Sequence, residues 1–441
     1  MLRPAVVACW LTLVGLPAAL AQSPPAAVRT PVPTAGVDAQ PATLPSSNAS
    51  LLHLTEMALQ NNPTVRQARA NLRRVRGMRF QVSRYPNPTL GYAATEIGNE
   101  GRAGQQGLYV NQQFVTSGKL GLNDQIYGWY EQVAQWNLQV QELRVSGAVR
   151  QSYFDLLANR SRLALLKKLA TISENSAKIT DSLFDAGEIA RGQMLQAKLY
   201  VRRNRIAIAT AQSAVLASQR SLLTVMGTLD VPLTEMQGQL DAPLPPKLDF
   251  ETTWQQMRST SPELKAAEAD VVRSQWRIER EQVEPVPNLN TSISAQYDYA
   301  TQYTIATVQI GIPLPVYNKN RGRIQAAQAG YIRASHEVRR RELELRQRLI
   351  TAINAYQTAR NQAFKIEQEV LPLARESLQT TSKTFELGES SYQDLLTAQR
   401  TLVQSGLDAI EARRIVFQTF SQIDTYLLSD GLTAARQTPL P

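Results

Sequence analysis

The sequence predicts a mostly helical fold with a small β part, in which one helix–strand–strand–helix–helix unit occurs twice. Three observations support this fold class. Several short phrases recur in the same order at an offset near 200 residues. Each half also contains two segments of alternating apolar and polar side chains, and one helical stretch far longer than a compact domain needs. We therefore expect two structural repeats, at residues 50–228 and 250–428.

The first residues have the features of a secretory signal peptide. A basic residue, Arg3, precedes an apolar run, and the small residues Ala19 and Ala21 have the spacing of a cleavage site. The apolar run is shorter than the roughly 20 residues of a membrane-spanning helix. We expect residues 1–21 to be removed during export of the chain.

The segments outside the repeats are expected to lack a core. Residues 22–49 are rich in Pro, Ala, Ser and Thr without periodicity, which is typical of a flexible leader. The Pro-rich residues 229–249 are expected to link the repeats, and residues 429–441 to form a disordered tail. The one cysteine, Cys9, lies inside the signal peptide, so the exported chain has no disulfide.

Each repeat begins with a predicted helix, over about 51–84 in the first half and 251–284 in the second. The next two elements alternate between apolar and polar side chains, most clearly in Leu289–Tyr299 and Thr304–Ile312. The first-half counterparts, Thr89–Ile97 and Tyr109–Val115, alternate less clearly.

Strands of this length, apolar on one face and polar on the other, suit the wall of an outer-membrane barrel, with lipid outside and water inside. A soluble, half-buried hairpin predicts the same alternation, so the pattern alone leaves both readings open. On the barrel reading, five residues are expected to face lipid: Leu289, Ile293, Tyr297, Val308 and Ile310.

The fourth element of each repeat is a very long helix. Residues 119–185 contain no proline, and the early part carries apolar residues at alternating spacings of four and three. This heptad seam comprises Leu122, Ile126, Trp129, Val133, Trp136, Val140 and Leu143. Such a helix would be on the order of 100 Å long. Its counterpart, residues 322–387, has a looser seam.

A glycine turn and a last helix complete each repeat. The turn is written FDAGE in the first half and FELGE in the second, with Gly187 and Gly388 at matching positions. A helix that reverses direction benefits from a residue that tolerates positive φ at its end. Both turns are therefore expected at the same end of the molecule, far from the strands.

Composition and motifs argue against nucleic-acid binding and catalysis. The basic excess, 47 Lys and Arg against 37 Asp and Glu, is dispersed along helices and interleaved with acids, as in residues 337–348. The stretch around His336 lacks the second histidine of a zinc-protease motif, and Gly118-Lys119 lacks the rest of a phosphate loop. We expect no catalytic residues, no bound metal and no cofactor.

Taken together, the signal peptide, the duplicated unit and the repeated turn resemble the TolC family of outer-membrane efflux proteins, over roughly residues 51–428. The phrases NPTVRQARANL, PNPTLGYAATEIGNE and IPLPVYNKNRGRIQAAQA resemble its heavy-metal branch, typified by CzcC. The resemblance implies a homotrimer, with four strands from each protomer in one transmembrane β-barrel and the helices forming a periplasmic α-helical barrel continuous with it.

The resemblance also assigns roles to residues near the turns. In this family the turns dock onto a periplasmic adaptor, which implies that role for Ala186, Gly187, Glu188, Ile189, Leu387, Gly388, Glu389 and Ser390. An acidic ring that narrows the tunnel in some members corresponds to Asp394, with Gln193 at the equivalent first-half position and Thr397 at the next acidic position. The ring would thus be thinner here.

The predicted function is the outer-membrane exit duct of a tripartite efflux system, which passively conducts cargo such as heavy-metal cations. Its partners would be the adaptor, an inner-membrane pump of the RND type and outer-membrane lipid. A periplasmic coiled-coil adaptor or scaffold is the alternative from a different class, and an outer-membrane component of type I secretion is an alternative of the same fold. An exported enzyme has no residue constellation in its favour.

Overall fold

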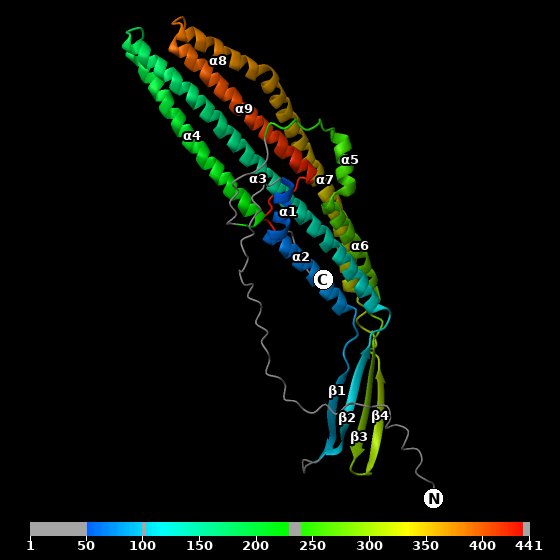
Figure 1. The fold of residues 1–441 in the computed structure, drawn as a ribbon. Helices are drawn as coiled ribbons and strands as arrows, with labels where there is room; N and C mark the ends of the chain where they lie inside the picture. Colours follow the sequence, from blue (N-terminus) through cyan, green and yellow to red (C-terminus); the bar gives the residue numbers. More distant parts are fainter. Residues whose placement is uncertain (1–50, 99–102, 229–239, 435–441) are drawn as a thin grey trace. The chain divides into compact units, whose positions relative to one another are not determined.

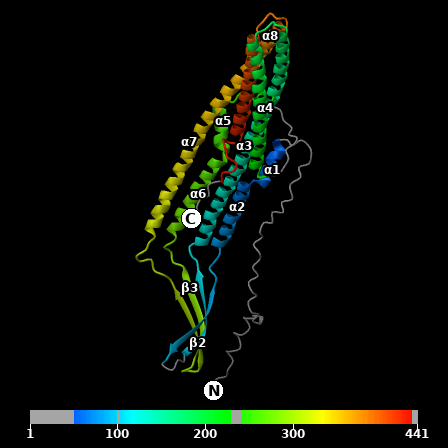
Figure 2. The same cartoon turned by 90° about the vertical axis from the view of Figure 1, so that its left-hand side faces the viewer.

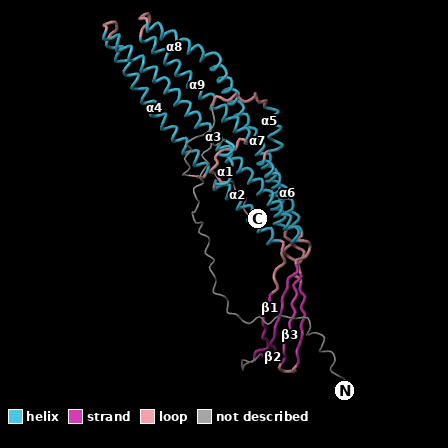
Figure 3. The backbone as a smooth tube through the Cα atoms, viewed as in Figure 1, coloured by secondary structure: helices cyan, strands magenta, loops and turns pink. Residues whose placement is uncertain are grey.

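The described part of the chain consists of long helices at one end and a four-stranded sheet at the other. The computed structural model describes residues 51–98, 103–228 and 240–434, which all belong to one unit, Ser46–Pro441. Figure 1 and Figure 3 show the sheet at one end of this unit and two helical hairpins that reach the opposite end. The predicted signal peptide and leader, and residues 229–239 of the predicted linker, lie outside the described residues.

The element order repeats, as the sequence predicts. The first half contains α1 (Leu51–Asn61), α2 (Pro63–Val82), β1 (Thr89–Ile97), β2 (Ala103–Phe114), α3 (Lys119–Asp185) and α4 (Arg191–Met226). The second half contains α5 (Phe250–Thr260), α6 (Pro262–Gln282), β3 (Leu289–Asp298), β4 (Tyr303–Gly311), α7 (Arg321–Lys365), the π-helical turn η2 (Ile366–Val370), α8 (Leu371–Glu386) and α9 (Tyr392–Asp424). The predicted fold class, mostly helical with a small sheet and a duplicated unit, is confirmed.

The first helix of each repeat is two helices rather than one, which corrects the sequence prediction. The breaks fall at Asn62 and Ser261, each directly before a proline, where ψ is 125° and 121°. A proline ring excludes the preceding residue from helical backbone angles, so the chain is extended for one residue before it turns back into helix. The side chain of Asn62 then caps α2 by accepting a hydrogen bond from the backbone of Thr64 at 2.9 Å.

The long helix of the second repeat is also interrupted, unlike α3, which runs unbroken through 67 residues. Pro372 lacks the N–H group that an α-helix needs at its position. The chain responds with a π-helical turn just before it, in which the backbone N–H of Leu371 donates to the carbonyl of Ile366. The proline therefore divides the predicted helix at residues 322–387 into α7 and α8.

The predicted heptad seam of α3 is only partly buried. Ile126, Val133 and Val140 are buried, but Leu122, Trp129, Trp136 and Leu143 remain half-exposed. The buried stripe instead includes Tyr130 and Ala134, which pack with Leu72 and Val75 of α2. Because α3 lies against several helices of its own chain, its core face is displaced from the one that a two-helix seam would bury.

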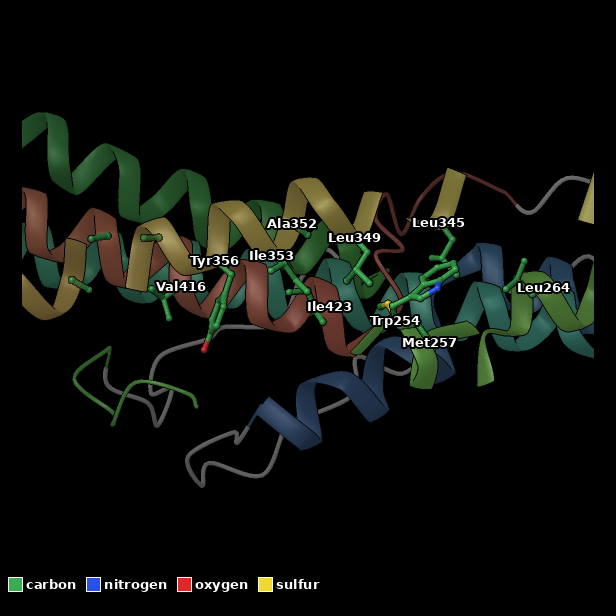
Figure 4. Packing of buried hydrophobic residues seen from close by; sticks show 13 residues of the cluster. Trp254, Met257, Leu264, Leu345, Leu349, Ala352, Ile353, Tyr356, Val416 and Ile423 are labelled. Carbon is green, nitrogen blue, oxygen red and sulfur yellow. The ribbon is translucent and has the colours of Figure 1, made fainter. Parts of the chain in front are cut away.

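The main core of the second repeat lies where α5, α6, α7 and α9 meet (Figure 4). Trp254 and Met257 of α5 pack with residues of α7 and with Val416 and Ile423 of α9. Residues 240–246 of the predicted linker pack against this core. The hydroxyl of Tyr356 donates to the carbonyl of Pro246 at 2.7 Å, and Arg413 donates to the carbonyls of Leu240 and Ala242 at 2.8 Å.

Part of the predicted disordered tail packs against the helices. Gly431 is buried, and its carbonyl accepts a hydrogen bond from the hydroxyl of Thr64 at 2.9 Å. Gln141 of α3 donates to the same hydroxyl, so Gly431 is held by a buried polar network. Residues 435–441 lie outside the described part. No described helix combines the length and the apolar character that crossing a membrane requires.

Candidate functional site

The four strands form one antiparallel sheet in the order β1-β2-β3-β4, so the two halves of the chain meet at β2 and β3. Figure 2 shows this sheet beside the ends of α2, α3, α6 and α7. β2 begins at Ala103, six residues before the predicted start at Tyr109. Its early part, AGQQG, has no apolar alternation, but Gln105, Gln106 and Gly107 are paired on both sides, with β1 and with β3.

The register places apolar side chains on one face of the sheet. Ile293 of β3 lies opposite Val110 of β2 and opposite Val308 of β4. Because directly paired residues share a face and alternate residues return to it, the whole face follows from these pairs. Its large apolar members are Leu90, Tyr92, Leu108, Val110, Phe114, Leu289, Ile293, Tyr297, Val308 and Ile310.

All five residues predicted to face lipid lie on this apolar face. Most of the face is open in the protomer: Val308 and Ile310 are each 65% exposed and Leu90 is 69% exposed. The first-half members, such as Leu108 and Val110, do not follow from the sequence pattern, because glycines and glutamines interrupt the alternation there. The pairing register is the signal that identifies them.

The opposite face is largely polar. It carries Asn290, Ser292, Ser294 and Gln296 from β3 and their partners Gln309 and Thr307 from β4, together with Tyr109 and Gly91. Ile305 and Tyr303 are the large apolar side chains of β4 that share this face. A sheet with one apolar and one polar face can separate a lipid phase from water.

Each half of the chain ends its long helix in the same hydrogen-bonded turn. Gly187 has φ of 79° and Gly388 has φ of 78°, both in the left-handed region. Glu188 N donates to the carbonyl of Leu183 at 2.9 Å, and Glu389 N donates to that of Thr384 at 2.8 Å. This bond, from a residue to the fifth one before it, ends a helix in a Schellman motif.

The predicted tip residues gather at the end of the unit farthest from the sheet (Figure 1). Ala186, Gly187 and Glu188 are exposed, as are Leu387, Gly388 and Glu389, whereas Ile189 and Ser390 are half-buried. Leu387 is 73% exposed, so it presents apolar surface at the turn.

The two hairpins are joined behind these turns by a buried cluster. Phe385 and Tyr392 pack edge to face with ring centroids 6.0 Å apart, and Ala197 of α4 lies in the same cluster. Gln399 of α9 donates to the hydroxyl of Ser176 of α3 at 3.0 Å. Burial raises the pKa of Tyr392 to about 12, so its ring stays neutral in the cluster. The tips therefore form one packed body within the protomer.

Asp394, the predicted aperture residue, lies in the first turn of α9, where it caps its own helix. Its carboxylate accepts hydrogen bonds from the hydroxyl of Ser391 at 2.7 Å and from the backbone N–H of Ser391 at 3.2 Å. The hydroxyl of Ser391 in turn accepts from the backbone of Asp394, which completes a capping box. Gln193, on α4, is half-buried and its side chain makes no such cap.

No group of three His, Cys, Asp or Glu side chains in residues 51–98, 103–228 and 240–434 is arranged to hold a metal ion. His53 lies in the first turn of α1 and His336 lies on α7, so the two histidines are on different helices.

The profile of the outer membrane efflux protein family matches the chain twice, over residues 54–228 and 253–427. Each match runs through one helix–strand–strand–helix–helix unit, and the two together exceed half of the chain. The chain belongs to the outer membrane efflux protein family. The family predicted from the sequence is thereby confirmed.

This efflux protein is similar to CzcC of Cupriavidus metallidurans, described as a cobalt-zinc-cadmium resistance protein. The two are 26% identical over 283 residues, which make up 64% of this chain and 67% of CzcC.

Solved structures of outer-membrane channels have the same fold. The outer-membrane channel OprN matches with a TM-score of 0.72 at 17% identity, over 87% of this chain and 91% of OprN. The outer membrane protein VceC of Vibrio cholerae matches with a TM-score of 0.71 at 17% identity, over 86% of this chain and 96% of VceC. This efflux protein therefore has the fold of outer-membrane channels.

Proposed function

We propose that three copies of this efflux protein form an exit duct in the outer membrane, with four strands from each copy in one closed β-barrel. The helices of the three copies would then surround a tunnel through the periplasm. The duct carries out no chemistry of its own. Membership of a channel-forming family supports this.

The sheet register is the observation that carries the proposal. β1 and β4 each have one neighbour among the described strands, so each leaves one edge of backbone N–H and C=O groups without strand partners. In a lipid phase, such an edge must be paired, because no water is available to satisfy it. Pairing β4 of one copy with β1 of the next satisfies both edges and continues the apolar face around a cylinder.

The exposed tips support the second part of the proposal, a tripartite assembly. The turns at Gly187 and Gly388 would dock onto a periplasmic adaptor that connects the duct to an inner-membrane pump of the RND type. The two turns have the same hydrogen bonds, and the buried cluster behind them joins the two hairpins. They would therefore present similar surfaces to a partner that repeats around the tunnel axis. Selectivity and energy would come from the pump.

Heavy-metal cations are the proposed cargo, because the similar CzcC is described as a cobalt-zinc-cadmium resistance protein. Three copies of Asp394 near the tunnel mouth would favour cations. Secretion of a polypeptide by a type I system is the competing cargo. A deletion strain complemented with this chain should regain tolerance to cobalt, zinc and cadmium; restored secretion of a polypeptide without metal tolerance would contradict the proposed cargo.

Conductance of the purified trimer in a planar lipid bilayer tests the duct itself. We expect stepwise conductance from trimeric protein, and retention in the membrane fraction after carbonate extraction. Trimeric protein that inserts but never conducts would overturn the proposal. Release of the chain by carbonate would instead favour a periplasmic scaffold.

A further inference from the structure

The sheet has two edge strands, and the loops that connect them to the helices carry unpaired positive charge. We call these loops, together with the adjoining ends of α2 and α7, the basic edge segments: residues 80–88, which lead into β1, and residues 312–323, which follow β4. Arg84 lies in the first, and Lys319, Arg321 and Arg323 lie in the second. All four side chains are exposed, and none forms an ion pair or hydrogen bond with another described residue.

Acidic residues are missing from long stretches around both segments. No Asp or Glu lies between Glu56 and Glu96, or between Asp298 and Glu337. Two acids, one in the last turn of α6 and one just after it, already accept hydrogen bonds. Glu281 accepts a hydrogen bond from Asn320 at 2.8 Å, and Glu284 accepts one from Arg280 at 2.6 Å.

The loop at the corresponding place inside the sheet is built differently. Lys119 is the first residue of α3, as Arg321 is of α7. It is 3% exposed and donates to the carbonyl of Val286 at 2.6 Å and to the side chain of Asn288 at 3.1 Å. At the inner connection, the ammonium group of Lys119 is therefore used in hydrogen bonds within the fold. At the edge connections, the charged groups of the basic side chains make no such bonds. A strand-to-helix connection in this fold can therefore form without an unpaired basic side chain.

The second segment also exposes apolar and aromatic side chains. Tyr317 is 100% exposed and Leu314 is 73% exposed. Buried Asn320 fixes the end of this segment, since it donates to both the carbonyl and the carboxylate of Glu281. In the first segment, Tyr85 is 59% exposed and the guanidinium of Arg84 lies 4.1 Å from the ring centroid of Phe80. Exposed tyrosines and basic side chains next to the apolar face of a sheet are typical of a membrane–water interface.

We propose that the basic edge segments bind the phosphate groups of anionic phospholipids in the membrane leaflet next to the helices. This inference rests on the proposed function, because closure of the barrel brings residues 312–323 of one copy beside residues 80–88 of the next. Each segment contributes basic side chains and contains no acid of its own, so a bound anion would reduce the repulsion between the positive charges across the seam. The tyrosines and Leu314 lie at the boundary between the headgroups and the acyl chains.

Lipid retention by the purified trimer tests this inference. The trimer is exposed to phosphatidylglycerol or phosphatidylcholine in detergent, and bound lipids are counted by native mass spectrometry. We expect the wild type to retain phosphatidylglycerol preferentially. The variant Lys319→Gln/Arg321→Gln/Arg323→Gln should lose that preference by roughly 100-fold, since each base contributes severalfold near an anionic headgroup. The matched control, Arg202→Gln/Arg203→Gln/Arg220→Gln, removes three exposed bases of α4 and should retain it.

Other outcomes overturn the inference. Equal loss in both triple variants would mean that only net charge matters. Unchanged retention in the first variant would mean that the segment binds no phosphate. Dissociation of the first variant into monomers would mean that these bases contact the neighbouring copy instead. A conducting wild-type trimer without preference for phosphatidylglycerol contradicts only this inference, whereas absence of a conducting trimer contradicts the proposed function.

A second measurement does not depend on charge replacement. Tryptophan fluorescence of Tyr317→Trp in vesicles of phosphatidylglycerol with brominated acyl chains should be quenched more than that of Tyr331→Trp. Tyr331 lies on α7, is 36% exposed and is farther from the strand. Equal quenching of the two added tryptophans would place Tyr317 outside the membrane and overturn the inference.

Discussion

Tyr109 of β2 lies directly across the sheet from Gly91 of β1, and its ring fills the space that a side chain at position 91 would take. A methyl group at Gly91 would collide with the ring of Tyr109. We therefore expect Gly91→Ala to destabilise the trimer by about 1–3 kcal/mol, the usual cost of overpacking. The temperature at which the trimer dissociates in detergent measures this effect.

A double variant tests the cause of that loss. Tyr109→Ala removes the ring, so Gly91→Ala should cost little when it is added to Tyr109→Ala. A full loss of stability in the double variant would show that Gly91 is needed for another reason, such as backbone flexibility at the sheet edge.

Charge on the apolar face should prevent insertion, whereas charge on the polar face should not. Ile293 faces Val308 and Val110, and its neighbour in sequence, Ser294, lies on the opposite face. Ile293→Lys should cost about 2–4 kcal/mol if this position lies near the middle of the bilayer. Ser294→Lys is the matched control. The fraction of protein that resists carbonate extraction should fall for the first variant only, and an equal fall for both would contradict the assignment of faces.

The sheet shows how far local pattern can predict this fold. The alternation in β3 and β4 identifies their apolar face because few residues interrupt it. In β2, the segment from Ala103 to Gly107 has no apolar alternation, and only its pairing with the neighbouring strands makes it part of β2. Whether this segment belongs to the sheet depends on its neighbours in the folded protein, so a short stretch of sequence cannot predict it.

The helices show a different limit. The breaks at Pro63, Pro262 and Pro372 follow from the proline rings, and the printed sequence contains that signal. The capping box of Ser391 and Asp394 also has a sequence signature, a serine followed three residues later by an acid. The half-exposure of Trp129 and Trp136 could not be predicted, because it depends on how α2 and α6 lie against α3.

Replacing both tip glycines should impair docking without affecting insertion. Gly187 and Gly388 have positive φ, which costs a β-branched residue about 1–3 kcal/mol. No neighbouring atom lies within 4 Å of a Cβ at either position, so the expected effect of Gly187→Val/Gly388→Val comes from backbone strain. Copurification of the adaptor with the trimer should fall, while the trimer stays in the membrane.

Gly192 provides the control for the tips. It lies in the first turn of α4, has open space around it and does not have positive φ. Gly192→Val should leave adaptor copurification close to that of the wild type. Normal copurification by the double tip variant would show that these turns are not the docking surface.

The aperture role of Asp394 can be separated from its capping role. Asp394→Asn removes the charge and weakens the cap, whereas Ser391→Ala weakens the cap and keeps the charge. Loss of a cap costs about 1 kcal/mol in either variant. If three carboxylates narrow the tunnel, the ratio of cation to anion permeability in planar bilayers should fall for Asp394→Asn and stay unchanged for Ser391→Ala. Equal permeability ratios would leave Asp394 with the capping role alone.

Acid should weaken the helical part of the protein through Glu337 of α7. Hydrogen bonds from Arg340 and Arg341 lower the pKa of Glu337 from 4.5 to about 2. Glu337 lines a cavity of about 680 Å³ together with Asp270 and Glu263 of α6 and Arg144 of α3. Because the folded-state pKa is lower than the unfolded one, the stabilisation is complete above pH 4.5 and is lost as the pH falls toward 2.

Thermal unfolding followed by circular dichroism across this pH range checks the effect. Glu337→Gln should be less stable than the wild type at neutral pH, and the difference should vanish near pH 2, where the wild-type carboxylate is also being protonated. The control is Glu376→Gln. Glu376 is an exposed acid of α8 that forms no ion pair among the described residues, so the stability of this variant should change with pH as that of the wild type does. A constant difference between wild type and Glu337→Gln at every pH would mean that packing, and not the charge of Glu337, accounts for the stabilisation.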